Sequence, residues 1–438
     1  MIRRRWGAAV RTAALVGLAV ASGCAGGPGG FTGAPRDEAA LPAADRLPRR
    51  PERVVLVAIP GLEPAHFLPA PAAAALAPRL AALAGGGVAV EVLHPVFPPA
   101  GLPALVSLAT GRSPARHGAF ALRPLEANGV GAPRPLPASA IEGETLWQAV
   151  GRGGGAAAAF DWPGTDGSPV AQSLPDAPAE PGAARDAALV RAACALLTGA
   201  SPPRLLGLVL AQAGIARAAA PPGSREAEAA VAGADAELGR LVDCLGRAGR
   251  LASSALVVTG DHGTLPVHTA VRPNAVLAEV GLITTQGGSV VRWNALARSN
   301  GGSAFVYARQ EDDALLARRA LEEAAGQTGA FHVVSAQEML ARGADPQAWF
   351  GIDAAPGWVF EDGAEGARLG PASQRAAGGY APGEPRMATG LVAWGAGLRP
   401  AVRVPELRQI DVAPTLAALL EVPLAGAEGR ALAGVLQP

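Results

Sequence analysis

Two adjacent residues, Asp261 and His262, have the side chains and the position of metal ligands. They belong to the segment "VVTGDHGT" (residues 257–264), in which an apolar run of strand length stops at an acidic residue and a histidine. Carboxylate and imidazole groups both bind zinc, and zinc sites use three or four such ligands. Asp261 and His262 therefore predict metal chemistry only if further ligands reach them from elsewhere in the chain.

Other potential ligands are few. His66, His94 and Asp161 lie near the ends of expected strands. Each is better explained as a surface or loop residue than as a compensating metal ligand. A metal site at Asp261 and His262 therefore depends on the elements that position this pair and on the side chains that those elements bring close to it.

Strands and helices are expected to alternate from residue 54 onward. The expected buried strands are residues 54–59, 156–160, 205–211 and 254–261, and the expected helices are residues 76–87, 102–111, 187–197 and 224–249. This alternation predicts an α/β fold with a mostly parallel sheet and helices on both faces. In such sheets the functional site lies at the carboxyl ends of the strands, where Asp261 and His262 stand.

A different pattern follows in residues 284–377. Short strand segments surround one charged helical segment, which predicts a small α+β insertion. The main sheet is expected to resume at residues 390–397, followed by a helix over 411–422. Asp411 is expected to cap the start of that helix.

Composition limits the possible partners. The formal net charge is +0 and the pI is about 7.0, so the chain lacks the basic surface expected of a protein that binds nucleic acid. Every basic residue is Arg, and Ala, Gly and Pro are abundant, which indicates a genomic composition bias. Half of the residues are hydrophobic, enough for a sizeable core.

The amino terminus has the pattern of an export signal. Residues 1–23 carry three arginines at positions 3–5, continue with a short apolar stretch and end in small residues. Cys24 follows directly and resembles the lipidated cysteine of a bacterial lipoprotein, with secretion without a lipid as the alternative. Residues 24–50 are rich in Gly and Pro and are expected to be a tether. The predicted location is the bacterial cell envelope, either anchored to a membrane by lipid or periplasmic or secreted.

Cys194 and Cys244 are the remaining cysteines, and both fall in helical patterns. In an exported protein they could form a disulfide. They are equally compatible with small buried core residues.

Seven segments occur in an order that identifies a family. They are "PGLEP" (60–64), "VFPPAGLPALVSLATGRSPARHGAF" (96–120), "FDWPGTDG" (160–167), "TGDHGT" (259–264), "RPNAVLAEVGLI" (272–283), "GGYAPGEPRMATGLVAWGAGLRP" (378–400) and "IDVAPTLAALLEVPLAGAEGRAL" (410–432). Together they resemble the nucleotide pyrophosphatase/phosphodiesterase branch of the alkaline phosphatase superfamily. The resemblance implies an alkaline phosphatase-like domain over residues 51–438.

The same resemblance implies a phosphoric ester hydrolase with two zinc ions and a Thr or Ser nucleophile at the start of a helix. The nucleophile position is Gly101, and the position of a phosphate-contacting Asn is Ala104. Four of the six implied ligand positions hold residues without a donor side chain: Pro60, Ala211, Ile215 and Gly378. Asp261 and His262 are the ligands that remain, so no catalytic residue is assigned.

Hydroxyl groups further along the helix do not replace the nucleophile. Ser107 and Thr110 lie one to three turns beyond Gly101, too far into the expected helix. His117 belongs to the ordinary pattern of the family and is expected to be structural.

Asp261 and His262 have two interpretations. As structural remnants, Asp261 would cap the following turn and His262 would bond to a backbone carbonyl. As a weak metal site, they would bind a single zinc ion. No cofactor is expected under the first interpretation.

Three functional hypotheses follow. The first is a catalytically inactive domain, a pseudoenzyme that binds an unknown ligand or partner in the envelope. The second is a divergent metal-dependent hydrolase of phosphodiesters, phosphomonoesters or sulfate esters, with a site rebuilt around Asp261 and His262. The third is a metal-binding protein without hydrolytic activity.

Overall fold

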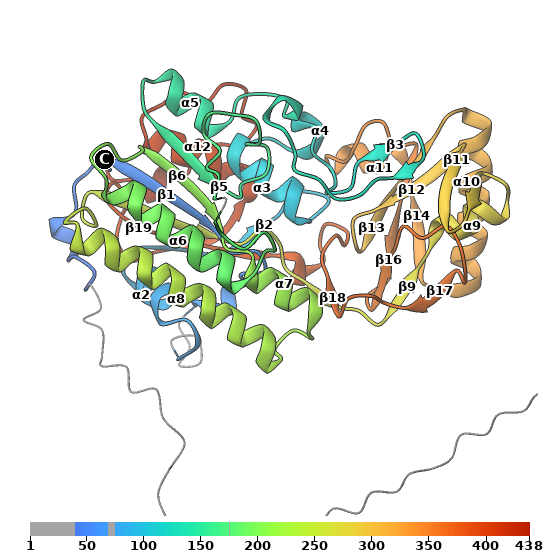
Figure 1. Cartoon of the computed structure of the whole chain (residues 1–438), viewed down its shortest axis with the longest axis horizontal. Helices are drawn as coiled ribbons and strands as arrows, with labels where there is room; N and C mark the ends of the chain where they lie inside the picture. The colour runs from blue at the N-terminus through green and yellow to red at the C-terminus, as the bar shows by residue number, and fades with distance from the viewer. Residues whose placement is uncertain (1–39, 69–74, 175) are drawn as a thin grey trace, which may run out of the picture. The chain divides into compact units, whose positions relative to one another are not determined.

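A seven-stranded sheet with the order β20-β2-β19-β7-β1-β6-β5 lies at the centre of the fold (Figure 1). The structure is a computed structural model and describes residues 40–68, 75–174 and 176–438. The strands of the sheet are β1 (Arg53–Ala58), β2 (Val88–His94), β5 (Ala157–Phe160), β6 (Leu205–Val209), β7 (Ser254–Thr259), β19 (Thr389–Gly395) and β20 (Val402–Arg408). β19 runs antiparallel to β2 and β7, and the other neighbouring strands pair in parallel. The expected mostly parallel sheet is confirmed.

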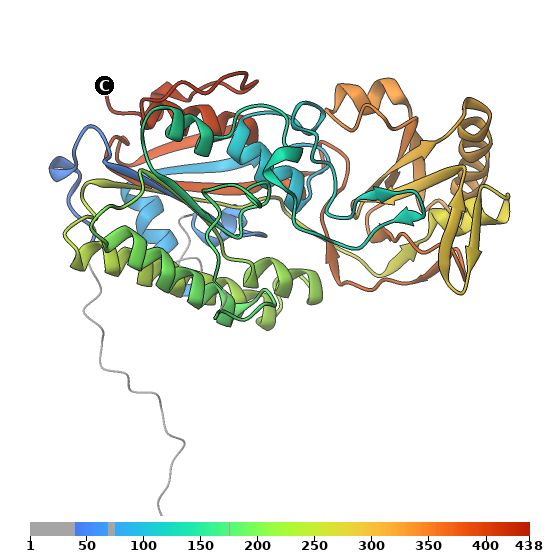
Figure 2. The same cartoon turned by 45° about the horizontal axis from the view of Figure 1, so that its top comes forward.

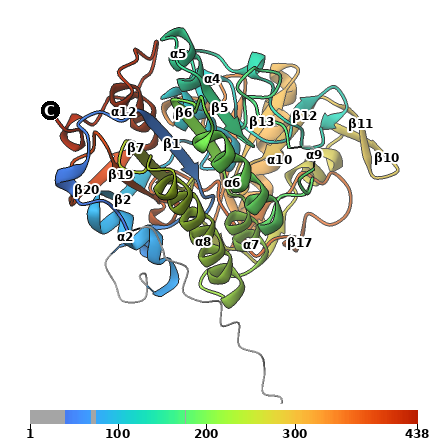
Figure 3. The same ribbon diagram turned by 60° about the vertical axis from the view of Figure 1, so that its left-hand side comes forward.

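Helices cover both faces of this sheet, as Figure 2 shows. One face carries α2 (Pro78–Gly86), α6 (Ala183–Thr198), α7 (Gln212–Ala219) and α8 (Arg225–Arg247). The other carries α3 (Gly101–Thr110), α5 (Leu146–Arg152) and α12 (Val412–Leu419). Figure 3 shows α6, α7 and α8 together on one side. β1 is buried along its whole length, because apolar side chains from both layers pack against it. The α/β class is thus confirmed.

Capping side chains explain where two of the helices begin. The Ser224 hydroxyl accepts a bond from the Ala227 amide at the start of α8, and Thr145 forms a capping box with Gln148 at the start of α5.

The expectation that the Asp411 side chain caps the following helix was wrong. Asp411 precedes α12, but its carboxylate makes no bond to the first turn of that helix. Its carboxylate instead accepts bonds from the Arg408 guanidinium and the Arg430 backbone amide. The bond from the charged guanidinium is stronger than a bond from a helix amide would be, because both of its partners are ionised.

A second group of sheets contains most of the segment expected to be an α+β insertion. Its largest sheet has the order β12-β13-β15-β14 and is antiparallel. Its elements are α9 (Pro273–Glu279), β10 (Ile283–Gln286), β11 (Ser289–Trp293), β12 (Ala295–Ser299), β13 (Ser303–Ala308), α10 (Glu311–Thr328), β14 (Phe331–Val334), α11 (Ala336–Ala341) and β15 (Phe350–Ala354). A three-stranded sheet adjoins them, with β9 (Thr269–Val271) between β16 (Trp358–Phe360) and β17 (Leu369–Pro371). Short elements complete the fold: α4 (Pro114–His117), β3 (Leu125–Glu126), β4 (Gly129–Val130), β8 (Leu265–Pro266) and β18 (Ala376–Ala377).

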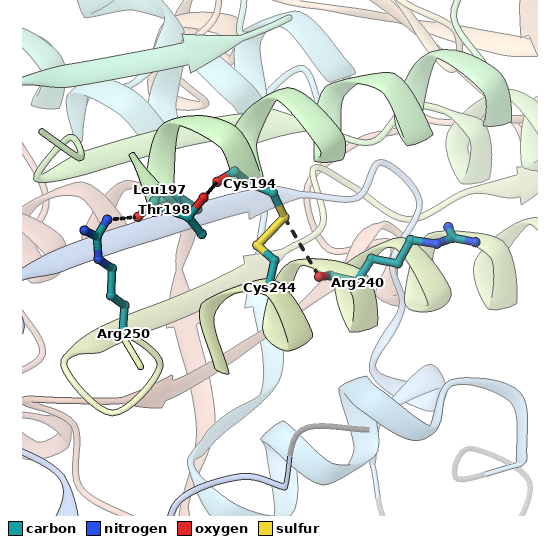
Figure 4. The surroundings of a disulfide bond; sticks show 6 residues. All are labelled: Cys194, Leu197, Thr198, Arg240, Cys244 and Arg250. Carbon is teal, nitrogen blue, oxygen red and sulfur yellow. Dashed lines mark hydrogen bonds between the residues drawn. A yellow bond between two sulfur atoms is a disulfide. The ribbon is translucent and has the colours of Figure 1, made fainter. Parts of the chain in front are cut away.

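Cys194 and Cys244 form a disulfide, which decides between the two alternatives left open by the sequence. Their Cα atoms are 6.1 Å apart, within the range that a disulfide spans. The bond joins α6 to α8 on the face where these helices pack side by side (Figure 4).

In the part of the chain that the structure describes, no helix is both long enough and apolar enough to cross a membrane. The predicted export signal and Cys24 lie outside the described residues.

Candidate functional site

The loops after β1 and β7 and the start of α3 meet at the carboxyl edge of the sheet, around Asp261. The Gly61 amide, just after β1, donates to Asp261 Oδ1 at 2.9 Å. A Cβ at Gly101, the first residue of α3, would lie 3.3 Å from Asp261 Oδ2. The structure thus brings the predicted nucleophile position next to the predicted ligand.

The other predicted positions lie around the same edge. A Cβ at Gly214 on α7 would lie 2.7 Å from Pro60 Cβ, so α7 packs directly against the loop after β1. Ala211 immediately precedes α7, and Ile215 lies one turn further on with 46% of its surface exposed. Ala104 is buried within α3.

Backbone amides bond to one of the two carboxylate oxygens of Asp261. Its side chain is nearly buried, and Oδ1 accepts bonds from the amides of Gly61 at 2.9 Å and His262 at 2.7 Å. Its backbone carbonyl accepts a bond from Gln409 Nε2 at 2.8 Å. These contacts join the ends of β1 and β7, as expected of a carboxylate that organises a turn.

The ring of His262 is held by a bond to its own loop. Nδ1 lies 2.8 Å from the carbonyl oxygen of Gly263, and because a carbonyl only accepts, Nδ1 carries the proton. Nε2 lies 3.5 Å from Asp261 Oδ2. Nε2 is therefore the ring atom left to bind a ligand.

A side chain at Gly378 would collide with this arrangement. A Cβ there would lie 2.7 Å from the Pro99 carbonyl oxygen and would overlap the His262 ring. Gly378 is the position where the family resemblance implies a histidine ligand. The backbone here has therefore closed over His262 and leaves no room for such a ligand.

Ser107 and His117 form a hydrogen-bonded pair that superficially suggests a nucleophile and its base. Ser107 Oγ lies 2.9 Å from His117 Nε2, and the Ala119 amide donates to His117 Nδ1 at 3.1 Å. Because Nδ1 accepts, Nε2 carries the proton and donates to Ser107, which is the wrong direction for a general base. Burial lowers the pKa of His117 to about 3, so it stays neutral. These contacts join α3 to α4.

The three alternative ligand candidates lie in unlike surroundings. His94 is exposed, and its Nε2 is 3.2 Å from Glu406 Oε2. His66 lies in the connection between β1 and α2, so the loop part of its expectation holds; it is nevertheless buried, at 4% exposed, where its Nδ1 accepts a bond from the Glu63 amide and closes a short helical turn. Asp161 forms a two-point ion pair with Arg185.

A cavity of about 720 Å³ opens beside the site. Its walls include Leu102 on α3, Trp162 after β5 and Ala211, so it borders both the nucleophile position and a ligand position. Asp161 and Arg185 also line it, and Arg185 Nη2 lies 2.5 Å from Asp161 Oδ1. Cavities of this volume, mainly apolar with few polar groups, are typical of small-molecule sites.

Asp186, which sequence reasoning missed, fixes one wall of this cavity. It lies on the first turn of α6 and is fully buried. Its carboxylate accepts bonds from the amides of Ala211 and Gln212, both at 3.0 Å. Burial raises the pKa of Asp186 to about 6, although these two bonds act in the opposite direction. An aspartate in an Ala-rich helix gives no sequence signal that it reaches another helix.

The side chains present do not fit the two-zinc centre that the family resemblance implies. Among residues 40–68, 75–174 and 176–438, no group of three or more His, Cys, Asp and Glu side chains could hold a metal ion. Asp261 and His262 are adjacent, but the other implied ligand positions hold an apolar side chain or, at the glycine, none: Pro60, Ala211, Ile215 and Gly378.

Comparisons with known proteins agree with the family resemblance. The sequence model of the type I phosphodiesterase / nucleotide pyrophosphatase family matches residues 54–380. Human ectonucleotide pyrophosphatase / phosphodiesterase 5 superposes with a TM-score of 0.71 at 17% identity, over 88% of this chain and 100% of the human one. Comparison with curated protein sequences gives no match.

The murine counterpart of that enzyme gives similar values. It superposes with a TM-score of 0.72 at 18% identity, again over 88% of this chain and 100% of its own. An inactive threonine-to-alanine variant of the murine protein, in complex with AMP, matches equally well. At these identities the structures establish the fold, and they confirm the expected alkaline phosphatase-like architecture.

Proposed function

Because the chain belongs to the type I phosphodiesterase / nucleotide pyrophosphatase family, we propose that it is a catalytically inactive member that serves as a binding or scaffolding module of the bacterial cell envelope. One observation carries this proposal. At the edge where the family's site would form, Asp261 and His262 are surrounded by Pro60, Gly101 and Gly378 instead of further donors.

The energetics of metal binding support this proposal. Structural zinc sites with four ligands bind with roughly 10–16 kcal/mol. Two ligands retain about half of this or less, which corresponds to micromolar affinity at best. The two backbone amides that bond to Asp261 both donate to Oδ1, so Asp261 offers a metal ion one free carboxylate oxygen, Oδ2, rather than two.

The absence of a nucleophile supports the same conclusion. Gly101 has no hydroxyl, and Ser107 is buried and bonded to His117. The murine neighbour, inactive with one threonine replaced by alanine, nevertheless forms a complex with AMP. A family fold without turnover can therefore still bind a ligand, and the 720 Å³ cavity beside Gly101 offers this chain a place for one.

The proposed envelope location draws on two features. Residues 1–24 have the pattern of a lipoprotein signal with Cys24 as the lipidated residue. The Cys194–Cys244 disulfide supports an oxidising compartment, since disulfides are rare in reducing cytosol.

Metal content and turnover test the proposal together. Purified protein equilibrated with zinc and then desalted is expected to hold well under one zinc per chain by elemental analysis. It is also expected not to hydrolyse bis-p-nitrophenyl phosphate. Hydrolysis that disappears in Asp261→Ala would instead establish the divergent hydrolase, while zinc binding lost in that variant without any turnover would establish the metal-binding protein.

A further inference from the structure

Arg217 on α7 is a buried cation that the site described above does not use. It is 1% exposed, although an arginine is normally found at the surface. Its Nη2 donates to Glu63 Oε1 and also lies 3.4 Å from the Thr264 hydroxyl. A Cβ at Gly61 would lie 2.7 Å from Arg217 Cδ, so the methylene stem lies directly against that glycine.

These contacts reach three segments of the chain that also hold former ligand positions. Residues 60–63 follow β1 and include Pro60, and residues 211–217 include Ala211 and Ile215. Residues 261–264 follow β7 and begin with the Asp-His pair. In a family member with two zinc ions, ligands from these same segments would converge on the metals, and the metals would hold the segments together.

We propose that the Arg217 guanidinium replaces the metal ions as the cation that holds these three segments together. The site of this chain then keeps its shape without metal. This inference rests on the proposed function, because it presumes that zinc does not occupy the site.

The chemistry of arginine suits this role. A guanidinium stays charged when buried and presents five N–H donors in a fixed plane, so one group can bond to several segments at once. Arg217 uses Nη2 for both Glu63 and Thr264, while its stem packs on Gly61. A buried charge without its partner is strongly destabilising. Substitution of either Arg217 or Glu63 is therefore expected to weaken the contacts between the three segments.

The neighbouring titratable groups are consistent with this arrangement. Burial raises the pKa of Glu63, and the charge of Arg217 opposes that rise. Burial, and then Arg217, lower the pKa of His66 to about 4, so His66 stays neutral beside the ion pair. Glu228 Oε2 lies 4.0 Å from His66 Nε2, and Arg386 contributes a weaker positive charge near Glu63.

The test compares Arg217→Met with a matched variant, Arg298→Met. Arg298 is also buried, but it pairs with Tyr307 and Asp345 in the second group of sheets. Both variants are expected to lower the Tm, by about 5–10 °C. In hydrogen exchange, only Arg217→Met is expected to lose amide protection, at least tenfold, together in the three segments. Wild-type protein should show the same Tm and exchange with EDTA as with added zinc.

Two results would overturn the inference. One is unchanged exchange in the three segments of Arg217→Met. The other is a wild-type chain that loses protection in those segments when EDTA is added, because a metal would then hold them. The second result also refutes the proposed function when zinc is found in the protein, whereas the first leaves it standing.

A milder variant covers the case in which Arg217→Met does not fold. Glu63→Gln keeps the shape of the side chain and removes its charge. It is expected to lower the Tm and to speed exchange in residues 60–63 first, since Glu63 belongs to that segment. Unchanged exchange there in Glu63→Gln would equally overturn the inference.

Discussion

The buried carboxylate of Asp186 illustrates how single residues set the shape of the candidate site. It accepts bonds from the Ala211 and Gln212 amides, and burial raises its pKa from the ordinary 3.8 to about 6. A raised pKa means that the folded chain binds a proton more tightly than the unfolded chain. The resulting stabilisation is complete below about pH 4 and is lost as the pH rises through about 6.

The Asp186→Asn variant tests this pH dependence. Asn does not ionise, so titration at position 186 should not lower the free energy of unfolding of this variant between pH 4 and pH 7. Relative to Asp186→Asn, the wild-type free energy of unfolding is expected to fall by about 2 kcal/mol over that range. Urea unfolding of both proteins at pH 4, 5, 6 and 7 measures the difference. A difference that stays constant with pH would refute the assignment of this titration to Asp186.

Among the residues of the candidate site, the sequence predicts those that stand in family motifs and misses those whose role depends on tertiary packing. Asp261, Gly101 and Pro60 could be placed because they stand at fixed points in an ordered set of motifs, and the fold brings them together. Asp186 and Arg217 could not be predicted as site residues. Each acts on a segment 25 or more positions away, and such contacts follow from tertiary packing rather than from local pattern.

Among the elements, prediction succeeded where apolar residues were continuous or strictly periodic. β1 and β7 are buried along their whole length, and α8 has a clear apolar stripe. β20 was not predicted. It lies at the edge of the sheet, is mostly exposed and contains a proline, so its sequence lacks the apolar run of an inner strand.

The disulfide between α6 and α8 gives a prediction for these elements. Its closed loop spans 50 residues, for which the chain-entropy relation gives about 4 kcal/mol of stabilisation. The Cys194→Ser/Cys244→Ser variant is expected to unfold with a free energy lower by about 2–4 kcal/mol in urea. Reduced wild-type protein is the matched control and should unfold like the double variant. Equal stability of the oxidised wild type and the variant would contradict this.

For the molecule as a whole, the family's fold is present, and the proposed function separates that fold from the family's chemistry. The sheet has helical layers on both faces, and the family's sequence model matches residues 54–380. Of the ligand positions that the family resemblance implies, Asp261 and His262 are the two that hold a side chain able to bind a metal ion. A large core tolerates this because its stability comes from burial of apolar surface on both faces of the sheet, which does not depend on the few polar residues at its edge.

The proposed envelope location of the whole chain rests on lipidation of Cys24, and one substitution tests that lipidation. A single acyl chain binds membranes only marginally, so stable anchoring requires the multiple acylation that a lipoprotein cysteine receives. The full-length Cys24→Ser chain, expressed in a bacterial host, is expected to lose this modification and to leave the membrane fraction. Labelling with a palmitate analogue should mark wild type and not the variant, and Cys194→Ser/Cys244→Ser, with Cys24 intact, should stay labelled. If Cys24→Ser fractionates with membranes as wild type does, the proposed lipid anchor at Cys24 is refuted.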